Sequence, residues 1–494
     1  MSPDSIPRYS FDFGAGIAST GVLTRTSSAL NGGQPQRIGY WVNDTSLAWG
    51  LLTRISPCLA DLLDVGEAIY FADRLGLREP PGDQRLPRDR WHRRLDVAIP
   101  VRCLSRWARP EVVCLLEELL GFLTDDVWTI RFRRRSIEPR QAEMLNSFLQ
   151  LRTDQIEVTL LGGGLDSLCG LVKLMVSLNH EMIVPVTVVS NPRVRGMTMA
   201  IVQELRKAGV SEAEIMPVHL RTGISGVGRA RDDREPSQRA RGILFLLAGI
   251  VAEVLSGSDR LRVCENGIGA IGLPMTPDHW GSRATKSMHP KTLALMSKQV
   301  SIILDRPFAI DNSGLYPTKG NLLRVLNDNR LLPASKVAAS CDQAIYMRNG
   351  EACGFCTSCV LRRVAVVAAG LSSALDDAAI KYKVDWLDPM WRWDPDKAIP
   401  FYAMREQVER VRKATELNTG FAGLARAFPD LFDVVTAEAQ RGLEAVEIEK
   451  RIVNLYAEHV REVDELVALI DRPGWGRQAT VTHLIPRSIA SATG

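Results

Sequence analysis

The amino-acid sequence predicts an α/β fold with a doubly wound parallel sheet, and two observations lead to this prediction. From about residue 150 onward, extended apolar runs alternate with helix-like runs, as expected when each strand of a parallel sheet is followed by a helix. Residues 182–189 form a nearly continuous β-branched run, which is typical of a strand covered on both faces. In such a sheet, ligands bind at the carboxyl ends of the strands.

Length and composition limit the class of protein. A chain of 494 residues is too long for one compact core and suggests about three domains. Its net charge of +4 permits an anionic ligand but does not by itself indicate nucleic acid. The N-terminus lacks the layout of a signal peptide, and the longest apolar stretch, residues 243–252, is too short to span a bilayer. We therefore expect a soluble, cytoplasmic protein that does not engage a membrane.

Three regions are expected along the chain. Residues 1–145 are predicted to form an N-terminal α+β domain with strands at 94–101 and 127–132 and a helix that begins at Pro110. The polar residues 133–139 are interpreted as a solvated boundary. The middle domain is assigned to 150–375, with strands at 156–160, 182–189, 214–220 and 260–264 and helices at 168–178, 196–208 and 243–255, and a mostly helical region follows at 376–494.

Apolar residues recur at three- and four-residue steps from Ile452 to Ile470 in the C-terminal region. This spacing places them on one side of a helix. We interpret the stripe as an intramolecular packing face, and a partner-binding helix is the alternative.

The most informative stretch is Leu161–Ser167, which reads Leu-Gly-Gly-Gly-Leu-Asp-Ser and lies between a predicted strand and a helix-like run. Small residues allow backbone N–H groups to converge on an anion, and the start of a helix adds the positive end of its dipole. Asp166 and Ser167 fall near the N-cap, where short oxygen side chains are favoured. The pattern predicts a phosphate site, and an ordinary turn that needs positive φ is the alternative.

Four of the nine cysteines are concentrated between residues 341 and 359. Two consecutive C-x-x-C steps, preceded by one more cysteine, allow four thiolates to converge tetrahedrally on zinc. A disulfide pair is disfavoured in a cytoplasmic chain, and an iron–sulfur cluster is the other alternative. We predict a structural zinc knuckle and take the remaining cysteines as scattered free thiols. The predicted ligands are Cys341, Cys353, Cys356 and Cys359, and the scattered cysteines are Cys58, Cys103, Cys114, Cys169 and Cys264.

The ending Gly-Gly-x-Asp-Ser of the glycine stretch resembles the PP-loop of the ATP pyrophosphatases, whose pattern is Ser-Gly-Gly-x-Asp-Ser. These enzymes cleave ATP to AMP and pyrophosphate while they adenylate a substrate oxygen. The stretch is not a Walker A loop, because no Gly-Lys-Ser/Thr follows the glycines. Gly162 stands where the family has its leading serine, so one hydroxyl contact to the phosphates is missing. The resemblance implies an adenine nucleotide alpha hydrolase-like fold for residues 150–375.

The PP-loop followed by the cysteine knuckle resembles 7-cyano-7-deazaguanine synthase, the QueC family, over about residues 156–370. Arg239–Gly242 falls where that family places an arginine-bearing turn, and Tyr316–Gly320 resembles its lysine-containing turn near the phosphates. The family adenylates the carboxylate of 7-carboxy-7-deazaguanine, forms an amide with ammonia and dehydrates the amide to a nitrile. Classical members are much shorter, so the resemblance leaves both ends of this chain unaccounted for.

Several details resemble more closely the QueC-like proteins of the bacterial anti-phage systems Qat and type IV CBASS. In these systems the implied chemistry joins a deazaguanine carboxylate to a protein amine, at the N-terminus of a partner protein encoded nearby. The stretches that carry this resemblance are residues 89–91, 122–128, Glu265–Gly267, Ser282–Pro290 and 353–363.

The resemblance implies how ATP and Mg²⁺ would be held. The amides of Gly162, Gly163, Gly164 and Leu165 and the hydroxyl of Ser167 would bind the phosphates. Asp166 would position Mg²⁺, and a purely N-capping role is its alternative. The groups that would neutralise charge on the departing pyrophosphate are Arg239, Arg241 and Lys319, and a surface ion pair is the alternative for either arginine taken singly.

Three further residues are assigned to the substrate. Glu265 would recognise the guanine-like N–H edge and Asn266 would orient a phosphate or the base, with loop capping as the alternative for both. His289 precedes a proline in a polar turn and would act as a base on the amine or hydrogen-bond the carboxylate. A histidine that only fixes the loop is the alternative.

The function predicted from these residues is an adenylating, amide-forming enzyme that uses ATP, Mg²⁺ and Zn²⁺ and a deazaguanine substrate. Two acceptor amines stay open as alternatives: the N-terminal amine of a partner protein, and ammonia. A PP-loop tRNA-modifying enzyme would need a long basic, aromatic-interleaved surface, which the near-neutral charge does not supply, so we expect no nucleic-acid partner. An inactive scaffold is the third class, suggested by Gly162.

Overall fold

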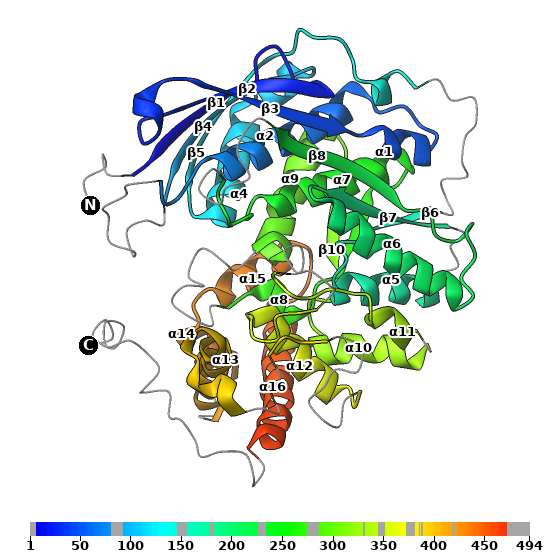
Figure 1. Ribbon diagram of the computed structural model, residues 1–494, viewed down its shortest axis with the longest axis vertical. Coiled ribbons are helices and arrows are strands. Elements are labelled where there is room, and N and C mark those ends of the chain that lie inside the picture. Colours follow the sequence, from blue (N-terminus) through cyan, green and yellow to red (C-terminus); the bar gives the residue numbers. More distant parts are fainter. Residues whose placement is uncertain are drawn as a thin grey trace.

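The computed structural model joins strands from the first and the middle region of the chain in one sheet (Figure 1). It describes residues 6–80, 92–145, 156–177, 182–225, 234–273, 286–329, 331–343, 351–371, 381–384, 386, 389–416 and 420–471. The strands are β1 (Arg8–Asp12), β2 (Thr20–Ser27), β3 (Gln36–Asn43), β4 (Arg94–Val101), β5 (Val127–Arg134), β6 (Ile156–Leu160), β7 (Met182–Val189), β8 (Val218–Ser225), β9 (Arg260–Val263) and β10 (Ala309–Asn312). Their order in the sheet is β10-β9-β6-β7-β8-β3-β2-β1-β4-β5.

The part of the sheet around β6 is parallel, as predicted. Val158 of β6 lies opposite Val184 of β7, and Thr159 lies opposite Arg262 of β9, with both pairs in parallel register. β8 and β10 extend this parallel block at its two sides. The predicted α/β class is therefore confirmed, with a sheet that is mostly parallel.

The sheet continues across the boundary that the sequence indicated near residue 145. β8 pairs antiparallel with β3, and β3, β2 and β1 form an antiparallel run. β4 and β5 then extend the sheet parallel to β1. The sequence pattern did not indicate this continuity, because the predicted strands of the first region were β4 and β5 alone.

Helices accompany the strands along the chain (Figure 1). In chain order they are α1 (Thr45–Gly50), α2 (Pro57–Leu75), α3 (Leu104–Trp107), α4 (Pro110–Thr124), α5 (Leu165–Ser177), α6 (Pro192–Lys207), α7 (Arg241–Leu255), α8 (Gly267–Ile271), α9 (Pro290–Leu304), α10 (Lys319–Asp328), α11 (Leu332–Ser335) and α12 (Thr357–Ala368). They are followed by α13 (Pro395–Glu416), α14 (Gly420–Ala427), α15 (Leu431–Ala439) and α16 (Ala445–Ile470).

The two faces of the sheet are covered unequally. On one face, α2, α4, α7 and α9 share a single core with side chains from both halves of the sheet. On the other face, α5, α6, α10 and α12 form a second core, which reaches the sheet at Leu161 and Ile183. That same face of β1 and β5 carries exposed side chains such as Ser10 and Arg131.

The helices at the C-terminal end pack together below the sheet in the view of Figure 1. Ile452, Tyr456 and Val463 of α16 are buried in these cores. The predicted apolar stripe is therefore an intramolecular packing face.

Three local predictions need correction. The strand predicted at 214–220 is in part β8, which starts at Val218 and continues to Ser225; before Pro217, which has no N–H to donate, Ile215 makes only an isolated parallel bridge to Ile183. Arg133 and Arg134 belong to β5 and not to a solvated boundary, since they pair with the last residues of β4. Cys58 and Cys103 are not separate thiols: the packing of α2 against β4 brings them together, with a Cα–Cα distance of 5.8 Å, and they form a disulfide.

Part of the resemblance falls outside the described residues, namely positions 89–91 and 282–285. Over the described ranges, no helix combines the length and the apolar character needed to cross a membrane.

Glu67 on α2 is a buried acid that links the helix layer to β8. Its Oε2 atom accepts a hydrogen bond of 2.6 Å from Thr222, and burial raises the pKa of Glu67 from 4.5 to about 8. Because the folded-state pKa is the higher one, the stability that this carboxyl contributes is present below about pH 4.5 and is lost as pH rises toward about 8. We predict that Glu67→Gln stabilises the protein more near pH 9 than near pH 5. The change that it causes in the free energy of unfolding should be more favourable at pH 9 by roughly 1–3 kcal/mol.

The measurement is chemical unfolding of wild type and variant at both pH values. Glu118→Gln, at an exposed position of α4, is the matched control and should leave the pH dependence unchanged. Parallel pH profiles for wild type and Glu67→Gln would contradict the assignment.

Candidate functional site

The candidate site lies where the strand order of the parallel block reverses. β6 is flanked by β7 on one side and by β9 on the other, so the segments that follow β6 and β9 leave the sheet at adjacent carboxyl ends. Such a switch point forms a crevice in which α/β proteins bind their ligands. Leu161–Ser167 follows β6, and Cys264–Asn266 follows β9.

The turn after β6 has a backbone suited to an anion. Gly163 has a φ of +87°, in the left-handed region that favours glycine, and a Cβ added at Gly162 would have no atom within 4 Å. Within the described ranges, the backbone amides of Gly162 through Ser167 donate no hydrogen bond to the chain. The hydroxyl of Ser167 donates to the carbonyl of Gly164 at 3.0 Å. Free amides at the start of α5 are the donors that a phosphate requires.

A carboxylate and an ammonium meet beside this turn. Lys319 Nζ lies 2.7 Å from Asp166 Oδ2, although the two residues belong to different helices. Asn266 Nδ2 donates to the same oxygen at 3.2 Å. The other oxygen, Asp166 Oδ1, is buried and has no hydrogen-bond partner among the described residues. Three of the predicted site residues are thus brought together by the fold.

The charges of this cluster depend on one another. Burial, and next the negative charge of Asp166, raises the pKa of Glu265 well above its ordinary value. Burial alone would lower the pKa of Lys319, but the charges of Asp166 and Glu265 outweigh it and raise that pKa. Lys319 is therefore held as a cation next to the glycine turn.

A contact from the C-terminal region supports the lysine and was missed in the sequence. Thr318 caps α10 by accepting a hydrogen bond from the amide of Asn321, and its hydroxyl donates to Glu462 of α16 at 2.5 Å. Burial raises the pKa of Glu462 to about 7. The sequence signal for this contact was a glutamate, Glu462, next to the buried stripe of α16. Its partner Thr318 lies 144 residues away in the chain, so the sequence did not identify the contact.

Arg239 and Arg241 are found at the start of α7, in contacts away from the glycine turn. Arg239 is buried and donates to the carbonyl of Thr124 at 2.6 Å, and it pairs with Asp125 at 3.3 Å. Burial lowers the pKa of Arg239 to about 9. The guanidinium of Arg241 lies 5.3 Å from the ring centre of Phe245. The pyrophosphate roles of both arginines stay predictions, and the ion pair of Arg239 is buried on the arginine side, unlike the surface ion pair given as its alternative.

His289 has the geometry of a residue that fixes its loop. It is the N-cap of α9, where its Nδ1 atom accepts a hydrogen bond of 3.1 Å from the amide of Lys291. Its ring lies edge-on to Phe122, with 5.0 Å between the ring centres. Burial lowers the pKa of His289 to about 3, so the imidazole is neutral and a weak base. The predicted role as a base has no support from these contacts.

The four cysteines predicted to bind zinc converge. Their sulfur atoms all lie within 4.8 Å of one another, and three of the four residues are buried. A zinc ion bonded tetrahedrally to sulfur at about 2.3 Å separates two sulfurs by about 3.8 Å, and the distance from Cys353 to Cys359 is 3.7 Å. The set of Cys341, Cys353, Cys356 and Cys359 could therefore hold zinc.

The cysteine knuckle is connected to the glycine turn by one short segment, residues 335–341. The amide of Ala339 donates to the carbonyl of Gly163 at 2.8 Å, two residues before Cys341. Arg362 of α12 donates to the carbonyls of Ala338 and Ser335 at 2.9 and 3.0 Å. The proposed metal site thus helps to fix the position of the turn without contacting it.

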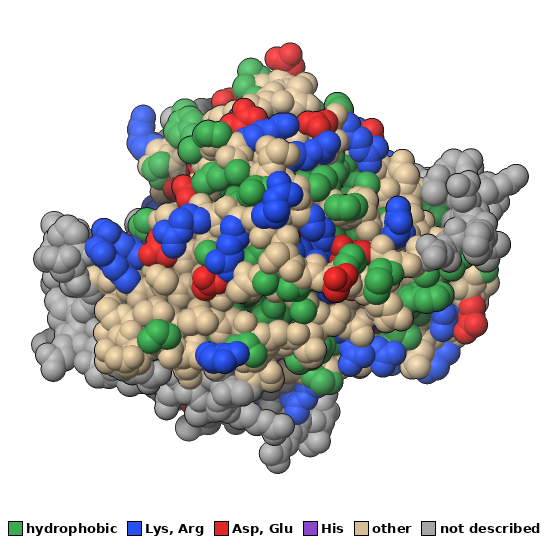
Figure 2. Space-filling view, turned by 90° about the horizontal axis from the view of Figure 1, so that it is seen from above, with side chains coloured by type: hydrophobic (Ala, Val, Ile, Leu, Met, Phe, Trp, Pro, Cys, Tyr) green, Lys and Arg blue, Asp and Glu red, His purple; other side chains and the backbone are tan. Residues whose placement is uncertain are grey.

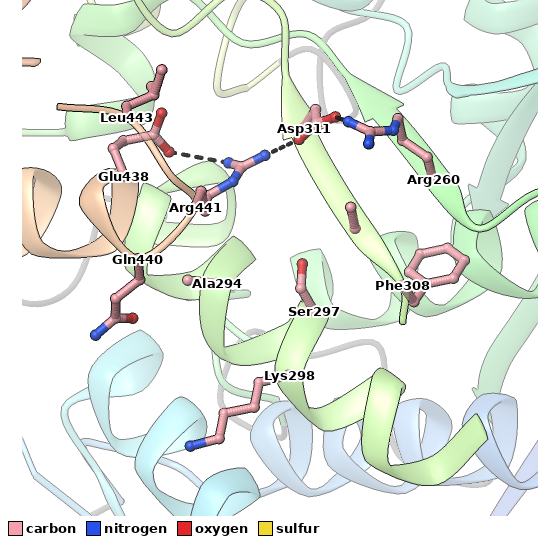
Figure 3. Close-up of a pocket in the computed structure, with 11 residues that line it drawn as sticks. Arg260, Ala294, Ser297, Lys298, Phe308, Asp311, Glu438, Gln440, Arg441 and Leu443 are labelled. Carbon is pink, nitrogen blue, oxygen red and sulfur yellow. Dashed lines mark hydrogen bonds and ion pairs between the residues drawn. The ribbon is translucent and has the colours of Figure 1, made fainter. Parts of the chain in front are cut away.

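A separate groove of about 620 Å³ lies beside the edge strand β10 (Figure 3). Its charged side chains pair largely with one another, since Arg441 bridges Glu438 and Asp311, and Asp311 also contacts Arg260. None of the predicted site residues lines it. The residues that line the groove are Arg260, Ala294, Ser297, Lys298, Phe308, Ala309, Asp311, Glu438, Gln440, Arg441 and Leu443.

No protein-family model matches this chain, and a search of curated proteins found no match either.

The knuckle generates a direct prediction. Cys356→Ser should remove one metal ligand, and because metal binding and folding are coupled, it should release zinc and lower the melting temperature by several degrees, for a loss of roughly 2–5 kcal/mol. Zinc content by mass spectrometry and thermal unfolding are the measurements. Cys114→Ser, at an exposed cysteine of α4, is the control and should change neither. A Cys356→Ser protein that melts like wild type and retains its zinc would show that the four-thiolate site is wrong.

Proposed function

We propose that the chain is an ATP-dependent carbon–nitrogen ligase that adenylates a carboxylate of the 7-carboxy-7-deazaguanine type and transfers it to an amine. The proposed acceptor is the N-terminal amine of a partner protein in an anti-phage defence system. The observation that carries the proposal is the convergence of Asp166, Lys319 and Asn266 beside the glycine turn. Free amides, a cation and a buried carboxylate oxygen are together what a nucleotide polyphosphate and its metal ion require.

In the proposed first step, a carboxylate oxygen of the substrate attacks the α-phosphorus of ATP. The new oxygen–phosphorus bond replaces the bond to the bridging oxygen, and pyrophosphate leaves with that electron pair. The amides that follow Gly162 and the ammonium of Lys319 would stabilise the charge on the leaving group. Lys319 is also the first residue of α10, so the positive end of that helix acts in the same direction.

Asp166 fits the magnesium ion that such a reaction uses. Its Oδ2 atom is held by Lys319 and Asn266, whereas Oδ1 is buried and without a partner in the described part of the chain. A carboxylate oxygen is a ligand that Mg²⁺ prefers. The ion would supply charge neutralisation between phosphate oxygens.

In the proposed second step, the amine nitrogen attacks the acyl carbon of the adenylate. The carbon–nitrogen bond forms, AMP leaves with the electron pair of the carbon–oxygen bond, and the amine gives up a proton. Glu265 follows β9 next to the turn and is the group proposed to recognise the N–H edge of the deazaguanine. Ammonia would react at the same acyl carbon. The first step is therefore the same for both acceptors, and only the product of the reaction identifies which amine was used.

Pyrophosphate release from ATP tests this function. We expect 7-carboxy-7-deazaguanine to stimulate release, and Asp166→Asn to lower the stimulated rate by about 100-fold or more, because the variant weakens the ligand for the Mg²⁺ that would neutralise the phosphate charge. Asp464→Asn, which makes the same change in an exposed ion pair with Arg412, should leave the rate unchanged.

The outcomes separate the functional classes. No stimulation by the deazaguanine, or a fully active Asp166→Asn protein, would exclude the proposed reaction at this turn. Stimulation by tRNA alone would favour a PP-loop tRNA-modifying enzyme. Mass spectrometry of the product distinguishes a modified protein amine from a free nitrile.

A further inference from the structure

Among the described residues, no helix covers one face of the sheet over β3, β2, β1, β4, β5 and the end of β8, and we call this the open face. Side chains alternate along each strand, and those on the helix side are buried, whereas most of the others are exposed or half-buried; His219 at the start of β8 and Pro100 near the end of β4 are the buried exceptions. Val22 and Val127, on the open side, are 45% and 54% exposed. The parallel strands β1, β4 and β5 belong to this open area. Parallel sheets are found almost always with both faces covered, so a bare one indicates a surface that a partner can occupy.

The open face is rich in arginine. Arg8 of β1 and Arg94 of β4 are register partners on adjacent strands, and like charges at such positions destabilise a sheet. The acids on this face are Asp12 and Asp96, and Asp12 is already bound by Arg133. Within the described ranges, no ion pair involves Arg8, Arg37 or Arg131. The arginines of the open face are Arg8, Arg37, Arg94, Arg131, Arg133 and Arg221.

The open face also has a flat aromatic group between small side chains. Trp41 of β3 lies over Gly223 of β8, where an added Cβ would come within 2.6 Å of the indole Nε1 atom. The guanidinium of Arg221 lies 5.9 Å from the ring centre of Trp41. Figure 2, viewed from the side on which β1, β2 and β3 lie in Figure 1, shows Lys and Arg side chains spread among hydrophobic and uncharged ones, with fewer acidic side chains.

We infer that this open face binds single-stranded nucleic acid. Such sites combine arginines that contact the phosphates with an aromatic side chain on which a base can stack, and they are tolerant of sequence. An acidic protein surface would also satisfy the arginines, but it would make no use of the flat indole of Trp41. The low total charge led us to expect no nucleic-acid partner, and the uneven distribution of charge on the folded chain changes that expectation. The inference does not depend on the proposed ligase activity.

Fluorescence anisotropy with a labelled oligothymidylate of about 20 nucleotides tests the inference. Contact with about four phosphates should make the affinity fall by about 50-fold between about 50 mM and about 200 mM NaCl. The triple variant Arg8→Ser, Arg94→Ser, Arg131→Ser should weaken binding by roughly 100-fold at the lower salt concentration and reduce the slope of the salt dependence by about 2. Trp41→Leu should weaken binding by about 10-fold.

A control of equal charge is available on the C-terminal helices. Lys413→Ser, Arg426→Ser and Lys450→Ser are exposed substitutions that remove the same charge from another surface, and together they should leave binding unchanged. If the triple variant of the open face does not fold, the wild type photocrosslinked to a 4-thiothymidine strand should yield modified peptides from β1, β3 or β4.

Three results would overturn the inference: no binding by wild type at the lower salt concentration, equal loss of binding in the control variant, or crosslinks confined to other elements. Polyglutamate is the competitor that separates the two kinds of partner. The face is an acidic-protein site instead if two results occur together. Polyglutamate displaces the oligonucleotide from wild type, and Trp41→Leu binds both polyglutamate and the oligonucleotide as tightly as wild type does.

Discussion

The position of β6 in the sheet is the constraint on which the candidate site depends. Every residue of β6 is buried, and the strand pairs in parallel with β7 on one side and with β9 on the other. The segments that follow β6 and β9 must therefore leave the sheet at one common edge. This is why Asp166 and Asn266, which are 100 residues apart in the chain, lie within hydrogen-bond distance.

Two other regions hold this edge from outside the sheet. Glu462 of the C-terminal helices binds Thr318, the residue before the lysine that pairs with Asp166. Ala339, in the segment that leads to the cysteine knuckle, binds the carbonyl of Gly163. The glycine turn, with its positive φ at Gly163, is thus fixed from three directions. The C-terminal region, which the PP-loop resemblance leaves unexplained, has at least this structural task.

The sequence was most informative where a local pattern has one physical cause. A β-branched run such as residues 182–189 reflects burial on both faces, and closely spaced cysteines can meet without help from the rest of the chain. It was least informative where a contact depends on the tertiary fold. β1, β2 and β3 alternate between buried and exposed residues over short lengths, and β2 and β3 include a glycine, so none of them forms a continuous apolar run. The partners of Arg239 and Glu462 lie more than 100 residues away, and nothing near either residue identifies them.

The total charge of the chain likewise does not reveal how charge is distributed on the folded protein. The protein has 61 basic and 57 acidic residues, and the small difference conceals where they lie. Ion pairs in the interior hold more acids than arginines. Because these clusters remove more negative than positive charge from the surface, arginines on the open strands are left without compensation. The seven acids are Asp44, Asp61, Asp64, Asp73, Asp126, Glu143 and Glu235, and the five arginines are Arg78, Arg93, Arg102, Arg135 and Arg140. A nearly neutral chain can in this way fold into a protein with a basic face, and composition alone does not reveal it.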